Sequence, residues 1–256
     1  LNLANVQPSG VEMGQQFGAK VGIDPATSRI IVTSPGLSTA GNIRGVVHIF
    51  DETAVGSNTW SLAQDLAIQE SVVSQFASAA TIDNDRILAG GLTGTTRGER
   101  TGSLLGYHRD MGAWVEDTRV LGGEPTLANT HLGSAVAIDG DTLAITTKPD
   151  SGSPWPPALS IYERDSAEPS KWTRKIKILE NAIYSGSTYG SQVALLDNYI
   201  FVSVPDSANS EIIAYRRDDQ GNWARANNKI NPFQRGGNLG AAMALGEDGW
   251  LALSRK

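Results

Sequence analysis

Three histidines, His48, His108 and His131, are the residues best suited to acid–base chemistry or metal binding in this chain of 256 residues. A metal site needs several convergent ligands, and a catalytic zinc site often has two histidines one helical turn apart. No His-Glu-x-x-His spacing occurs, and the absence of cysteine excludes thiolate sites, disulfides and cysteine nucleophiles. We therefore interpret all three histidines as structural and predict no metal ion and no cofactor.

Serines and carboxylates also lack a recognisable catalytic pattern. No Gly-x-Ser-x-Gly elbow is present, and the glycine-rich stretch 90–94 does not precede a helical pattern that could hold a phosphate. A glycosidase needs two close carboxylates facing one sugar, whereas most acids here fall at predicted turns or strand ends. The sequence predicts a protein that is not an enzyme, and a glycoside-acting enzyme ranks third among the possible functions.

Composition narrows the class of partner. The net charge is −6, which argues against nucleic acid or an anionic membrane surface as the main partner. Hydrophobic residues make up 40% of the chain, enough for a packed core, yet no apolar run approaches the roughly 20 residues of a transmembrane helix. We expect no transmembrane segment.

One sequence unit recurs five times and predicts the elements that carry these residues. Each copy opens with an aromatic residue or leucine, a small residue and a short small-and-apolar strand. The openings lie at Phe17, Phe76, Leu132, Tyr189 and Leu239, so they recur every 50 to 59 residues. This period, with no helical apolar stripe, indicates an all-β repeat protein.

Three further strands are expected in each complete unit. An apolar second strand follows a tight turn, and a third strand ends in an aromatic residue followed by charges, as in Tyr162-Glu163-Arg164. A tryptophan opens the fourth segment, at Trp60, Trp114, Trp172 and Trp223. Because these tryptophans recur in phase, we interpret them as packing residues. Four strands at this period are typical of a β-propeller blade.

The ends of the chain suggest how the propeller closes. Each tryptophan lies 16 to 18 residues before the next opening, and the same count back from Phe17 reaches the segment 1–6. We predict one domain, 1–256, forming a five-bladed propeller whose last blade is completed by the N-terminal strand. The blades are approximately 13–70, 71–128, 129–185, 186–235, and 236–256 with 1–12. Alternatives are a larger propeller, for example seven-bladed, and a strand supplied by another polypeptide.

The unit resembles the FG-GAP repeat of integrin α-subunit heads and of many bacterial surface proteins. The resemblance rests on Phe17-Gly18 and its variants, on Ser134–Ala144, and on Ile161–Arg164 followed by Trp172. It implies a β-propeller, and an extracellular or cell-surface location. Calcium-binding members carry an Asp-x-Asp-x-Asp-Gly loop, but the corresponding turns here, such as Asp139-Gly140-Asp141, are short and poor in acids. We interpret them as hairpin turns.

Long loops predict where a partner binds. In a four-stranded meander the second-to-third loops and the fourth-to-first connections lie on one face, which is also the ligand face in the integrin-like relatives. The candidate partner-binding residues on those loops are Arg44, Arg97, Glu99, Arg100, His131, Lys148, Asp150, Trp155, Tyr184 and Asp206. Trp155 stands between prolines, so it is either a rigid contact residue or a cap packed onto the blade.

These observations favour a non-enzymatic extracellular or cell-surface propeller for protein–protein recognition, adhesion or assembly. Its partner is then a protein or a neighbouring subunit. A carbohydrate-binding, lectin-like propeller is the alternative, with a glycan as ligand. It predicts similar pockets around the ring, whereas the candidate loops differ in length and composition.

Overall fold

The computed structural model describes residues 16–36, 45–68, 73–94, 102–121, 131–181, 188–205, 210–230, 239–246 and 248–254. The chain forms two compact units, Leu1–Gly123 and Glu124–Lys256. No helix in the described part of the chain is long and apolar enough to cross a membrane.

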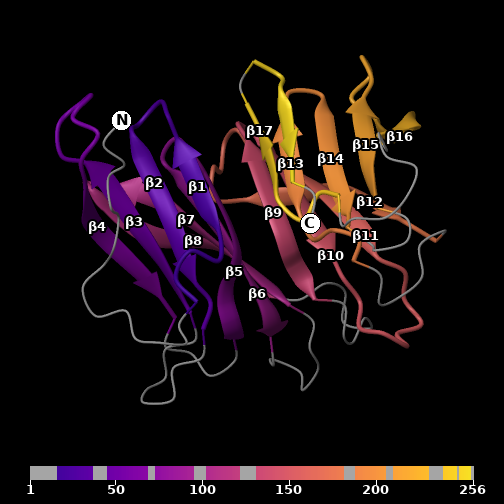
Figure 1. Cartoon of the computed structure of the whole chain (residues 1–256), viewed down its shortest axis with the longest axis horizontal. Coiled ribbons are helices and arrows are strands. Elements are labelled where there is room, and N and C mark those ends of the chain that lie inside the picture. The colour runs from indigo at the N-terminus through magenta and orange to yellow at the C-terminus, as the bar shows by residue number, and fades with distance from the viewer. Residues whose placement is uncertain are drawn as a thin grey trace. The chain divides into compact units, whose positions relative to one another are not determined.

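The first unit contains two antiparallel sheets of four strands, each in simple sequential order. Blade 1 consists of β1 (Val21–Asp24), β2 (Arg29–Ser34), β3 (Val46–Glu52) and β4 (Trp60–Ala67), which lie side by side in Figure 1. Blade 2 consists of β5 (Val73–Asp83), β6 (Arg86–Gly94), β7 (Ser103–Asp110) and β8 (Ala113–Leu121). Strands β1 and β2 pack against β5, and a core containing Ile31, Ile49 and Phe76 fills the space between the two sheets.

The second unit repeats this arrangement. Blade 3 consists of β9 (Leu132–Asp139), β10 (Thr142–Thr147), β11 (Ala158–Arg164) and β12 (Trp172–Leu179). Blade 4 consists of β13 (Val193–Leu196), β14 (Tyr199–Val204), β15 (Glu211–Arg217) and β16 (Trp223–Ile230). A fifth sheet has two described strands, β17 (Met243–Leu245) and β18 (Leu251–Leu253). Strand β13 packs against β9 on one side and β17 on the other.

Four-stranded blades stacked through their inner strands are the building plan of a β-propeller, so this part of the prediction is confirmed. The residues 1–15 lie outside the described part of the chain, so closure into five blades stays a prediction.

The predicted hairpin turns are confirmed in three blades. Two-residue turns join the first and second strands, and their first residues have positive φ: 51° at Asn84, 55° at Gly140 and 52° at Asp197. Asn, Asp and Gly tolerate this conformation best, which explains why these residue types recur there.

In all the described sheets except blade 2, a hydroxyl at or just after the end of the second strand fixes the opening of the blade. Thr33, Thr146, Ser203 and Ser254 each accept a hydrogen bond through the side-chain oxygen from the backbone N–H three residues after the opening residue, at 2.7–3.0 Å. The glycine after the opening residue has positive φ, for example 73° at Gly190. Regular pairing therefore begins later than the sequence suggests in blades 1 and 4, at Val21 and Val193. In blade 2, β5 instead begins before the opening residue.

Candidate functional site

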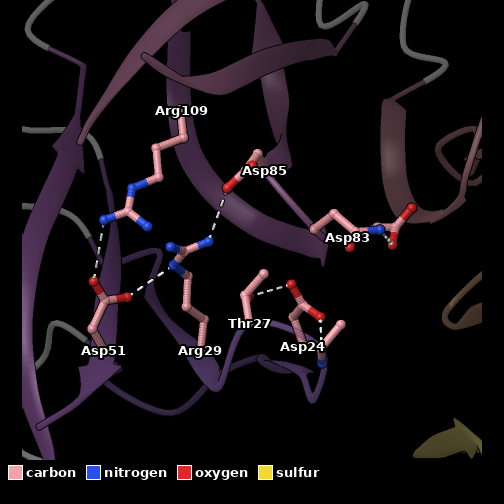
Figure 2. A network of polar contacts seen from close by, with 9 residues as sticks. Asp24, Thr27, Arg29, Asp51, Asp83, Asp85 and Arg109 are labelled. Atoms are coloured by element: carbon pink, nitrogen blue, oxygen red, sulfur yellow. Dashed lines mark hydrogen bonds and ion pairs between the residues drawn. The ribbon is translucent and has the colours of Figure 1, made fainter. Parts of the chain in front are cut away.

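The acids at the turns of the first unit contact arginines and the local backbone. Arg29, only 6% exposed, donates to Asp51 at 2.9 Å and to Asp85 at 3.1 Å, and Asp51 also lies 3.7 Å from Arg109 (Figure 2). Asp24 accepts hydrogen bonds from the Ala26 N–H and the Thr27 hydroxyl. These carboxylates therefore stabilise the turns and the blade 1–blade 2 contact. Among the described residues, no group of three His, Asp or Glu side chains could hold a metal ion.

A Ser–His–Asp chain crosses blade 1, and sequence reasoning missed it. The Ser34 hydroxyl lies 2.9 Å from His48 Nε2, and His48 Nδ1 lies 2.7 Å from Asp65. The Asp65 carboxylate accepts a hydrogen bond from Nδ1–H, so Nε2 is the nitrogen that accepts a hydrogen bond from the Ser34 hydroxyl. The three residues stand on adjacent strands, β2, β3 and β4. The signal in the sequence is His48 itself, at a third-strand position where blade 4 has the buried Ile213.

The burial of Ser34, His48 and Asp65 favours a structural role for these three side chains over nucleophilic catalysis. Ser34 is only 3% exposed, whereas the Asp65 side chain is 46% exposed. A catalytic triad has the opposite order, with an accessible serine and a buried aspartate. The residue after Ser34 is Pro35, which has no N–H to contribute to an oxyanion hole. The Phe17 ring also packs on His48, with centroids 5.4 Å apart.

We predict that His48→Leu lowers the free energy of unfolding by about 2 kcal/mol, because Ser34 loses its partner while it stays buried. Adding Ser34→Ala to the His48→Leu variant should lower the free energy of unfolding little further, because no buried hydroxyl then lacks a partner. Urea denaturation of the single and double variants measures both effects. Labelling of Ser34 by a fluorophosphonate probe would contradict the structural role.

The second unit brings two predicted site residues into direct contact. His131, which directly precedes β9, lies 3.0 Å through Nε2 from the carboxylate of Asp150, which follows β10. The Ser134 hydroxyl donates to the His131 carbonyl at 2.7 Å. The segment 148–157, which we call the blade-3 loop, is thereby fixed at its first end to the opening of blade 3.

Buried polar groups fix the other end of the blade-3 loop. The Glu180 N–H donates to the Pro157 carbonyl at 2.9 Å. Glu180 is 4% exposed, and its side chain accepts hydrogen bonds from Tyr215 at 2.7 Å and Arg225 at 2.6 Å. Tyr189 donates in turn to the Tyr215 oxygen at 2.9 Å. Burial raises the pKa of both tyrosines above the ordinary value, so they remain neutral donors.

Trp155 stands between these two anchors. The residue is 38% exposed, so part of its surface is buried and the rest faces solvent. The backbone N–H of Trp155 donates to the Ser153 hydroxyl at 3.3 Å, and the backbone N–H of Ser153 donates to the backbone carbonyl of Asp150 at 3.0 Å. The role of Trp155 as a contact residue or as a cap stays a prediction.

The blade-3 loop contains or contacts four of the ten predicted site residues: His131, Lys148, Asp150 and Trp155. Lys148 is half-buried and begins the loop. The other six lie outside the described residues, so their placement stays a prediction: Arg44, Arg97, Glu99, Arg100, Tyr184 and Asp206. Sequence reasoning did not identify Glu180 as an anchor, because its partners Tyr215 and Arg225 are more than thirty residues away in the chain.

No model of a known protein family matches the chain, and no curated protein sequence matches it either. The β-propeller part of the sequence resemblance is confirmed by the blades themselves, whereas membership of the FG-GAP family stays a prediction.

Proposed function

We propose that the protein is a non-enzymatic recognition module that binds a protein partner through the blade-3 loop. The observation that supports this most directly is Trp155, a half-exposed aromatic side chain on a loop fixed at both ends. An aromatic residue held in advance loses little conformational entropy on binding, and tryptophan is enriched among the residues that dominate binding energy. By the resemblance to FG-GAP proteins, we place the module at the cell surface or outside the cell.

The test compares Trp155→Ala with Trp250→Ala on one array of purified extracellular proteins. Trp250 is the matched control, because it is 77% exposed and lies outside the loop. We expect at least one bound protein to lose about 30-fold in affinity with Trp155→Ala, the effect of a hot-spot residue, and to be unaffected by Trp250→Ala. Hits confined to a parallel glycan array would favour the carbohydrate-binding alternative and overturn protein recognition.

For the fold, we propose that the repeat closes as a five-bladed propeller with the N-terminal segment 1–12 in the last blade. The support is the fifth sheet, which has only two described strands, together with the position of the segment 1–6 in the repeat. A two-stranded sheet is marginally stable alone and presents a free edge. The Gly18 variant considered in the Discussion tests this closure.

A further inference from the structure

Three side chains of blade 4 form a solvent-accessible row on one face of the sheet. Tyr199, the first residue of β14, is 42% exposed, and Arg216 lies directly opposite it on β15. The Arg216 guanidinium lies 5.8 Å from the centroid of the Tyr199 ring, and the Phe201 ring is nearly parallel to that of Tyr199, with centroids 6.3 Å apart. Arg216 is exposed and Phe201 is half-buried. We call Tyr199, Phe201 and Arg216 the blade-4 face.

Blade 1 shows what covers the equivalent face elsewhere in the repeat. Arg29 and Asp51 occupy the register positions of Tyr199 and Arg216. The guanidinium of Arg29 lies 5.6 Å from the ring centroid of Trp114 in blade 2, and Asp51 lies 3.7 Å from Arg109, also in blade 2 (Figure 2). The following blade therefore covers this face with an aromatic ring and with a charge opposite to that of Asp51.

Blade 3 repeats the charge pairing, and blade 4 reverses its sign. Glu163, which lies opposite Thr142, occupies the register position of Asp51 and lies 2.8 Å from Arg217 of the following blade. In blade 4 this position holds Arg216, and no described carboxylate pairs with its guanidinium. The pattern of the repeat therefore predicts a carboxylate opposite Arg216.

The aromatic part of the blade-4 face fits an extended polypeptide. Side chains on one face of a β-strand recur about every 6.7 Å, close to the 6.3 Å between the Tyr199 and Phe201 centroids. Sheets that pack face to face keep their strands within about 30° of each other, so a strand laid on β14 places two alternate side chains on the two rings. The N–H groups at the edge of a stacked guanidinium can still bind a carboxylate through two parallel hydrogen bonds.

The segments that could pack here within this chain supply no acid. The segment 1–6, which the closure proposal assigns to the last blade, contains neither Asp nor Glu. Strands β17 and β18 of the fifth sheet contain none either. None of these strands can therefore bring a carboxylate to Arg216.

We propose that the blade-4 face binds a β-strand of a partner protein that places a carboxylate on Arg216 and apolar side chains on Tyr199 and Phe201. The two rings supply affinity through apolar contact. The guanidinium supplies selectivity, because a neutral or basic side chain opposite it would leave its charge unpaired. The proposal rests on the recognition function proposed above, but it uses residues other than Trp155.

The test measures binding of a cyclic β-hairpin peptide to the whole chain by fluorescence anisotropy. One face of the hairpin carries two alternate Leu residues on one strand and a Glu opposite the first Leu, as the complement of the blade-4 face. Its counterparts replace this Glu by Lys, or move it to the other face of the hairpin. We expect the Glu hairpin to bind at least about tenfold more tightly than either counterpart. Tyr199→Ala should weaken its binding about tenfold.

Arg216→Glu should reverse the preference, so that the Lys hairpin binds more tightly than the Glu hairpin. The matched control is Lys171→Glu, which changes the net charge equally at a side chain that is 55% exposed and lies in the turn before β12. This control should bind all three hairpins like the wild type. An unchanged preference in Arg216→Glu, an equal loss in Lys171→Glu, or no binding of any hairpin would overturn the proposal.

Other occupants of the blade-4 face give separate outcomes. Tighter binding of an oligomer of glucuronic acid than of the Glu hairpin would indicate a glycan site and overturn the proposal. A wild-type dimer in sedimentation velocity that Arg216→Glu dissociates would identify a second copy of the chain as the occupant and overturn it as well. Trp155→Ala should leave hairpin binding unchanged, so failure of this proposal and failure of the blade-3 loop proposal can be told apart.

Discussion

Replacing Gly190 by alanine is expected to lower the free energy of unfolding by about 3 kcal/mol. The residue has φ of 73°, a conformation that costs an L-residue about 1 kcal/mol. An added Cβ would lie 2.6 Å from Thr146 Cβ and 2.8 Å from its Oγ1, and crowding of this kind costs about 2 kcal/mol. Thr146 has no room to move, because it is fully buried and donates to the Gly190 carbonyl at 3.0 Å.

Gly112→Ala is the matched control for the measurement by urea denaturation. Gly112 has φ of 89°, but a Cβ there would meet nothing within 4 Å. Its replacement should lower the free energy of unfolding by about 1 kcal/mol, the cost of holding alanine in a left-handed backbone conformation. Equal losses for the two variants would show that blade 4 does not pack on Thr146 as tightly as the structure indicates.

Gly18→Ala tests whether the repeat closes into a five-bladed ring. Gly18 occupies the same repeat position as Gly190, and a Cβ there would meet nothing within 4 Å. In a closed five-bladed ring, Ser254 would contact Gly18 as Thr146 contacts Gly190. Closure therefore predicts a loss near 3 kcal/mol for Gly18→Ala, and a loss near 1 kcal/mol would contradict it.

The repeat could be predicted because its backbone conformations and its packing require particular residue types at fixed positions in each unit. A left-handed residue after each opening requires glycine at positions such as Gly133, Gly190 and Gly240, and tight turns favour Asp, Asn and Gly. Alternation of apolar residues marks the strands. Blade 2 departs from the pattern, since Ala77 takes the position of the glycine with φ of 63°, yet its four strands form.

The candidate site was harder to predict, because its contacts join residues far apart in the chain. The position of His131 and Asp150 on one predicted face follows from strand order, but their direct contact depends on how the blade-3 loop folds. Glu180 is an ordinary acid in the sequence, and only packing shows that it is buried against Tyr215. Ser34, His48 and Asp65 meet because three strands pair in one particular register, which the sequence alone does not specify.

Stability should fall steeply above pH 10 because of the buried tyrosine pair. Burial raises the pKa of Tyr189 and Tyr215 above that of an unfolded tyrosine, which is about 10. Above that pH the unfolded chain releases both tyrosine protons, whereas the folded protein keeps them. Proton release therefore stabilises the unfolded state, and the free energy of unfolding falls. Each tyrosine then contributes a loss of about 1.4 kcal/mol per pH unit, or roughly 2.7 for the pair. Below pH 10 neither tyrosine makes the free energy of unfolding depend on pH.

The double variant Tyr189→Phe, Tyr215→Phe isolates this effect. At pH 8 it should be less stable than the wild type by about 2 kcal/mol, because the buried Glu180 keeps Arg225 but loses the Tyr215 hydroxyl. Above pH 10 the difference should shrink and then reverse. Burial also lowers the pKa of Lys20, and this shift makes stability rise with pH rather than fall. The contribution of Lys20 is the same in both proteins, so it cancels in the difference between their stabilities. Parallel stability curves for the two proteins up to pH 11 would mean that the tyrosines ionise in the folded state, so the second anchor of the blade-3 loop would be open to water.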